Sequence, residues 1–127
     1  MKKKIHILSV LLFISLLPTV LFTACDKDTN CYVDVLVLDE ATRKPVSNVI
    51  VELYQGNNIT DGLNYDTGVT NEEGIYSTHF VAPAIISIRA TYLVENNGYR
   101  NGSGTVRLVE GETKTAQVTL ESLVNYD

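Results

Sequence analysis

Apolar residues recur at every second position along most of this 127-residue chain, and this period of two constrains its fold more than any other feature. In "CYVDVLVLD", residues 31–39, Val33, Val35 and Val37 share one face with Cys31. The same spacing recurs in five further segments and one shorter run: 48–54, 75–81, 84–92, 105–109, 115–120 and 67–70. A strand turns alternate side chains to opposite faces, so each run can bury one side. About seven short strands predict an all-β fold, a single antiparallel Greek-key β-sandwich.

The segments between these runs have the composition of turns. "EATRKP" contains a proline that cannot sit in a central strand, and "NEEG" ends in a glycine that tolerates positive φ. "NNG" and "NGSG" predict a polar connection, and "EGET" predicts a hairpin between the last two strands.

The first 24 residues precede the sandwich and have the pattern of a secretory signal. Three lysines at 2–4 are followed by residues 5–22, which contain no Asp, Glu, Lys or Arg, and then by the small residues Thr23 and Ala24. Two alternatives stay open: an ordinary secretory signal followed by a structural cysteine, and an uncleaved membrane helix of about the minimum spanning length.

The stretch "LFTACDKD" resembles a bacterial lipobox, in which the cysteine thiol is acylated before cleavage. Phe22 stands where leucine is usual in that motif. The resemblance implies lipidation of Cys25, a signal at 1–24, a tether at 25–30, a sandwich domain at 31–122 and a tail at 123–127. Two or more acyl chains give stable membrane anchoring.

Asp26, Lys27 and Asp28 look like the acidic tag that sends some lipoproteins of Gram-negative bacteria to the outer surface. The alternative is a solvated linker. We therefore expect an outer-membrane lipoprotein, exposed at the surface if the tag operates. Residues 25–127 hold seven Lys and Arg against fifteen Asp and Glu, a formal charge of −8, which argues against a nucleic-acid partner.

The stretch 35–54 followed by 66–80 resembles a carboxypeptidase regulatory-like domain, a prealbumin-like (transthyretin-like) sandwich related in architecture to immunoglobulin-like folds. The matching landmarks are residues of turns and packing: Asp39, Pro45, Val46, Val49, Val51, Thr67, Gly68, Thr70, Gly74 and Tyr76. They imply the fold but give almost no information about activity.

The connection 55–65 is the most favourable place for a ligand site, because loops on a rigid sandwich often carry recognition residues. Its polar and aromatic side chains could bind a glycan: Asn57, Asn58, Asp61, Asn64 and Tyr65. The same residues are common in loops that bind nothing. Leu36, Leu38, Ile50 and Tyr54 fall on the second faces of their strands, where they either form a partner surface or are covered by loops.

Enzyme activity is not expected. "YRNGS", 99–103, resembles the Tyr-Arg-Gly-Ser signature of transthyretin-like hydroxyisourate hydrolases, but Asn101 interrupts it and His79 is the one histidine after the signal. His79 alternates toward solvent, away from the face of Tyr76 and Phe80. No catalytic constellation or cofactor motif is present.

A metal site is not expected either. The acidic residues Asp61, Asp66, Glu72 and Glu73 lack calcium-loop spacing. With Cys25 lipidated, Cys31 stands alone and we expect it to be a small buried hydrophobic residue.

The sequence therefore predicts a non-catalytic, lipid-anchored envelope protein that is a structural or binding module for glycans or partner proteins. An alternative is a subunit of a fimbria-like surface assembly, and a remote alternative is a transthyretin-like hydrolase.

Overall fold

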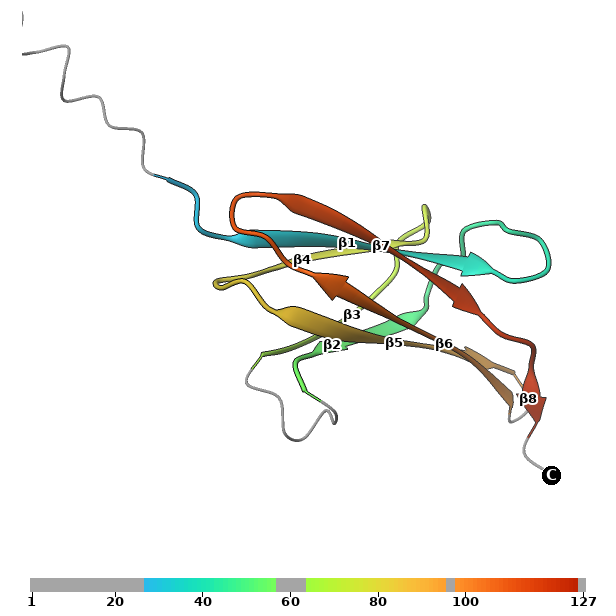
Figure 1. Cartoon of the computed structure of the whole chain (residues 1–127). Helices are drawn as coiled ribbons and strands as arrows, with labels where there is room; N and C mark the ends of the chain where they lie inside the picture. The colour runs from blue at the N-terminus through green and yellow to red at the C-terminus, as the bar shows by residue number, and fades with distance from the viewer. Residues whose placement is uncertain (1–26, 57–63, 96–97, 126–127) are drawn as a thin grey trace, which may run out of the picture.

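The computed structural model describes residues 27–56, 64–95 and 98–125 and confirms the all-β sandwich. The strands follow one another along the chain as β1 Cys31–Asp39, β2 Ile50–Tyr54, β3 Tyr65–Val69, β4 Ile75–Phe80, β5 Ile85–Val94, β6 Gly98–Arg107, β7 Thr113–Leu120 and the two-residue β8 Val124–Asn125. They form a sheet of order β4-β1-β7 and a sheet of order β3-β2-β5-β6-β8 (Figure 1). Within the described part of the chain, no helix is long and apolar enough to cross a membrane.

The core lies between the two sheets and is made of the faces that the alternation predicts. Val33, Val35 and Val37 of β1 are fully buried, as is Cys31. Opposite them lie Val49, Val51, Leu53, Ile86, Ile88 and Ala90, with Leu108, Ala116, Val118 and Leu120 closing the core. Side chains on the alternate positions of β1 and β2 are at least partly exposed, so the period of two gives the correct faces.

The pairing is antiparallel except at one place. β1 pairs antiparallel with β4, and parallel with β7 from Tyr32–Thr113 to Asp39–Leu120. β2 pairs antiparallel with β3 and with β5, and β5 with β6 over ten residues. The first strand of the sandwich is therefore the central strand of the small sheet.

Two sequence predictions about the β6 region are wrong. The "NGSG" stretch is not a polar connection but the middle of β6, in register with Arg89 and Ala90 of β5. The "EGET" turn does not form a hairpin, because β6 and β7 belong to different sheets and the chain crosses between them at 108–112. Gly102 explains the first error: a Cβ there would lie 2.4 Å from the carbonyl oxygen of Thr119 and 2.8 Å from Val118 Cγ1. Glycine lets β6 approach β7 across the sandwich, rather than marking a turn.

The landmarks of the regulatory-like resemblance contact one another. Thr70 is buried, and its hydroxyl accepts a hydrogen bond from the Val49 N–H (3.0 Å) and donates one to the Val46 carbonyl (2.8 Å). Gly74 has φ of +74°, as the "NEEG" turn predicts. The ring of Tyr76 lies against Gly68, where a Cβ would come within 2.0 Å of it. These residues therefore join the two sheets along the side formed by β3 and β4.

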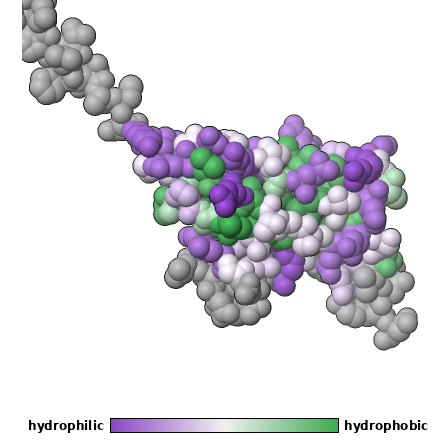
Figure 2. Space-filling model, in the orientation of Figure 1, coloured by the Kyte–Doolittle hydropathy of each residue, from purple (hydrophilic) through white to green (hydrophobic). Residues whose placement is uncertain are grey.

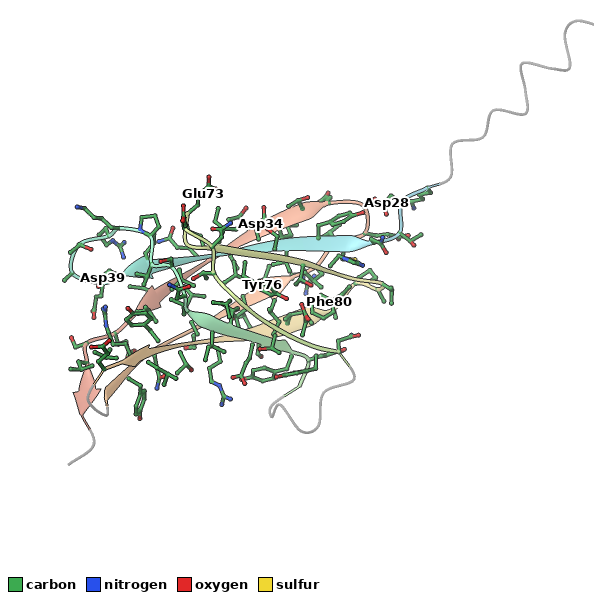
Figure 3. All side chains as sticks on the ribbon, turned by 180° about the vertical axis from the view of Figure 1, so that it is seen from behind. Asp28, Asp34, Asp39, Glu73, Tyr76 and Phe80 are labelled. Carbon is green, nitrogen blue, oxygen red and sulfur yellow. The ribbon has the colours of Figure 1, made fainter. Side chains whose placement is uncertain are left out.

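The two ends of the sandwich differ in their connections. The end where the N-terminal segment leaves, called here the tether end, holds residues 81–84 and 108–112 (Figure 1). The opposite end, called the distal end, holds residues 40–49, 70–74 and 121–123 (Figure 1). Figure 3 shows Asp28 at the tether end and Asp39 at the distal end.

Candidate binding surfaces

The described residues that flank the predicted ligand loop lie on the tether side of the sandwich, because β2 runs from the distal end toward the tether end. Of its five predicted residues, Asn57, Asn58 and Asp61 lie outside the described residues. Asn64 donates its side-chain N–H to Gln55 Oε1 (2.8 Å), and its carbonyl accepts from the Gln55 N–H (3.0 Å). These two bonds close the base of the loop.

Tyr65 is the exposed aromatic residue of this region. It begins β3, is 48% exposed and pairs with Tyr54 of β2 on the outer face of the large sheet. Next along this face, Arg89 Nε donates a hydrogen bond to Glu52 Oε2 at 2.6 Å. Arg89 Nη2 forms an ion pair with the same oxygen, also at 2.6 Å. Two tyrosines and a charged pair give this face groups that can stack and hydrogen-bond. Alternation placed Tyr54, Glu52 and Arg89 away from the core, but only strand pairing brings them together.

A second surface lies at the distal end of the same face and is apolar. Ile50 and Val69 are register partners on β2 and β3, and they are 37% and 53% exposed. Leu93 of β5 is 67% exposed and lines, with Ile50, an open hollow of about 500 Å³. Asn48, Tyr92, Val94 and Glu95 complete the lining. We call Ile50, Val69 and Leu93 the distal apolar patch. Of these three residues, the sequence placed only Ile50 on a second face, which either forms a partner surface or is covered by loops.

The other second-face residues have different surroundings. Leu36 and Leu38 of β1 and Tyr54 of β2 are each partly covered. Leu38 forms an antiparallel backbone bridge with Pro45, so the connection after β1 runs beside this part of the small sheet, in the plane of the sheet. Of the two roles that the sequence left open, an open surface describes Ile50, whereas Leu38 is only partly exposed.

The stretch that resembles a hydrolase signature has a structural role. Arg100 lies in β6; its guanidinium pairs with Asp39 Oδ2 (2.6 Å) and donates to the carbonyls of Glu121 (2.8 Å) and Leu120 (3.2 Å). Asp39 also accepts the backbone N–H groups of Ala41 and Thr42. The Thr42 N–H, and next the Arg100 guanidinium, lower the pKa of Asp39 to about 2. These contacts join the end of β1 to β6 and to the end of β7.

His79 and Cys31 lie where alternation predicts. His79 is exposed on β4, with its ring centroid 6.0 Å from that of Tyr32. Cys31 is fully buried, and its burial raises the pKa of its thiol, with smaller contributions from Glu110 and Asp28. A buried thiol with a raised pKa is a poor nucleophile.

Of the acidic residues considered for calcium, Asp66 lies in β3 and contributes to local structure. Asp66 accepts a 2.6 Å hydrogen bond from the Tyr76 hydroxyl. Burial, and then this bond, raise the pKa of Tyr76 to about 12. Glu72 and Glu73 are exposed in the turn before β4, and Asp61 lies outside the described residues. Among the residues that are described, no group of three His, Cys, Asp or Glu side chains could hold a metal ion.

The architecture defines a class, a single all-β sandwich domain, and solved structures of this class resemble it. GBS52, the minor pilin in the Gram-positive pathogen Streptococcus agalactiae, is similar with a TM-score of 0.55 and 13% identity over 80% of this chain and 48% of that chain. The Bacillus anthracis TIE protein is similar with a TM-score of 0.51 and 13% identity over 72% of this chain and 16% of that chain. The chain thus spans less than half the length of either protein, and identity this low shows the fold alone.

No model of a known protein family and no curated protein matches the chain. The carboxypeptidase regulatory-like resemblance and the lipobox therefore stay predictions.

Proposed function

We propose that the chain is a non-catalytic subunit of a cell-surface protein assembly, anchored to the outer membrane of a Gram-negative bacterium by acylated Cys25. The observation that carries this proposal is the distal apolar patch. Large contiguous apolar patches are uncommon on the surfaces of monomeric proteins, and where they occur they often mark interaction sites. The fold that the chain shares with a minor pilin supports the same function.

The chemistry of the patch fits a protein partner. Ile50, Val69 and Leu93 supply an apolar centre, and Asn48 and Glu95 supply polar groups beside it. Interfaces between proteins have this arrangement of an apolar core and a polar rim. The patch lies at the distal end, so an anchor at the tether end leaves it accessible.

The assembly is tested with the lipidated chain in detergent micelles. We expect concentration-dependent oligomers in sedimentation velocity, and their loss in the double variant Ile50→Asp with Leu93→Asp. Thr105→Asp, an exposed position of β6 on the same sheet, is the matched control and should leave assembly unchanged. Denaturant unfolding of each variant separates lost assembly from lost folding. A wild-type chain that stays monomeric at every concentration contradicts the proposal.

The anchor is tested separately. Mass spectrometry of the mature protein should show an acylated N-terminal cysteine at position 25, and Cys25→Ala should leave the detergent phase. Protease shaving of intact cells should remove the domain if it faces outward. An unmodified N-terminus would remove the anchor and leave the assembly proposal standing.

Glycan binding at the Tyr54–Tyr65 face is the second candidate. Tyr65 is open to solvent, and the Glu52–Arg89 pair lies in the next row of the sheet. Stacking of a sugar on Tyr65 predicts that titration of the mature chain with cell-envelope polysaccharides gives saturable binding, which Tyr65→Ala abolishes.

A further inference from the structure

The N-terminal segment is tied to the sandwich almost up to its proposed lipid. The Asp28 carboxylate accepts hydrogen bonds from the Tyr32 hydroxyl (2.8 Å) and the Asn30 N–H (3.0 Å). The Asn30 carbonyl accepts the Gly111 N–H at 2.8 Å. Only three residue steps separate Asp28 from Cys25, a contour of at most about 11 Å. An anchor on Cys25 therefore holds the tether end close to the lipid surface.

The tether end carries an apolar connection. Residues 80–86, "FVAPAII", contain no polar side chain; Phe80 and Ile86 are buried, whereas Val81 is 74% and Ile85 56% exposed. Ala82 and Pro83 between them are exposed as well. Phe80 pairs with Cys31, so Val81 follows directly beside the tied segment. Figure 2 shows hydrophobic surface at the end of the molecule from which the N-terminal segment leaves. We call Val81, Ala82, Pro83 and Ile85 the apolar tip.

We infer that the apolar tip rests in the interfacial layer of the same membrane that holds the lipid of Cys25. This inference depends on the anchor of the proposed function and adds to it the orientation of the domain. The short tether brings these side chains to the lipid surface, where burying them removes apolar area from water. The distal apolar patch then points away from the membrane, about 30 Å off along the nine residues of β1.

Charge at this end indicates an apolar contact rather than an electrostatic one. Arg107 is exposed beside Ile85 and lines with it a hollow of about 240 Å³, so its stem can cover apolar surface while its guanidinium reaches a lipid phosphate. Asp28, Glu110 and Glu112 lie at the same end, and Glu112 pairs with Lys114 at 2.9 Å. The carboxylates oppose attraction to anionic lipid, so membrane contact should persist at high salt.

The sequence contains no tryptophan, which gives a direct test. Val81→Trp and, at the exposed distal position Ala41, Ala41→Trp each introduce a single fluorophore into the mature lipidated chain. Both proteins are reconstituted into phosphatidylcholine vesicles with or without brominated acyl chains. We expect Trp emission at position 81 to shift to shorter wavelength and to lose most of its intensity to brominated lipid, with neither change at position 41.

The outcomes separate the inference from the proposed anchor. If the protein stays with the vesicles but Trp fluorescence is quenched equally at both positions, the anchor is supported and the membrane contact of the apolar tip is excluded. If Trp emission at position 81 shifts without quenching by brominated lipid, and the shift depends on protein concentration, a second copy of the chain covers the apolar tip. That result also contradicts the inference. Protein that does not associate with the vesicles overturns the anchor and the tip together.

Discussion

The two ends of this sandwich are held together by different kinds of contact. At the distal end, Arg100 joins Asp39 of β1 to the carbonyls of Leu120 and Glu121 at the end of β7. The buried Thr70 hydroxyl bonds two backbone groups of the connection before β2. At the tether end, the Tyr32 hydroxyl and the Asn30 N–H each donate an exposed hydrogen bond to Asp28, beside an apolar connection. Polar contacts that leave no buried group unpaired give a rigid end. The distal end is therefore expected to be rigid, whereas the tether end is held by exposed hydrogen bonds.

The largest effect is expected where β6 meets β7. Gly102→Ala would place a methyl 2.4 Å from the Thr119 carbonyl oxygen, and a backbone atom cannot move aside cheaply. We expect a loss of about 3 kcal/mol in the free energy of unfolding, measured by urea denaturation.

Gly104→Ala is the matched control, since its methyl would lie 3.3 Å from Val118 Cγ2 and 3.9 Å from the Gln117 carbonyl oxygen. Strain there is offset by the lower entropy of the unfolded chain, so its change should stay within about 0.5 kcal/mol. Equal effects of the two variants would contradict the close approach of β6 to β7.

Thr70→Val sharpens the contrast at the distal end. The variant keeps the shape of the side chain but leaves the Val49 N–H and the Val46 carbonyl without their partner. We expect destabilisation of about 2 kcal/mol in the same urea titration. Thr105→Val, at an exposed position, should be nearly neutral.

The Asp39–Arg100 pair predicts a smaller effect that depends on pH. The folded-state pKa of Asp39 is about 2 and its ordinary value is 3.8, so the stabilisation is complete above about pH 4 and is lost as the pH falls toward 2. Thermal melts across this window should show wild type losing more stability than Asp39→Asn. Parallel curves for the two proteins would exclude a role for the ionised carboxylate.

The smallest effect is expected at the tether. Tyr32→Phe removes the hydroxyl that holds Asp28, an exposed bond that contributes about 0.5 kcal/mol. Global stability should hardly change, but trypsin should cleave faster after Lys27, which is exposed just before the tied segment. Tyr65→Phe is the control and should leave that cleavage rate unaltered.

The burial of alternate side chains in each strand could be predicted because it depends on the local sequence alone. The inward faces of β1, β2, β5 and β7 follow from which side of a strand each residue occupies, and Cys31 and His79 lie as that pattern requires. The regulatory-like landmarks also reflect local turn chemistry, as the positive φ of Gly74 shows.

What the sequence could not show depends on contacts between distant segments. Gly102 reads as a turn residue until β7 is placed against it, and nothing near "EGET" shows that the chain changes sheets there. The distal apolar patch and the apolar tip were missed for a similar reason. Val69, Leu93, Val81 and Ile85 are ordinary strand and loop residues in sequence, and only the fold leaves them uncovered.

The parallel pairing of β1 with β7 has a consequence for biogenesis. The small sheet cannot be completed until a strand roughly eighty residues further along the chain has emerged, because Tyr32 is in register with Thr113. Contacts so distant in sequence slow folding, since the intervening chain must be ordered first. On the proposed export route, a polypeptide of this topology would stay open until β7 has followed β1, so the chain could cross a narrow channel before the domain closes.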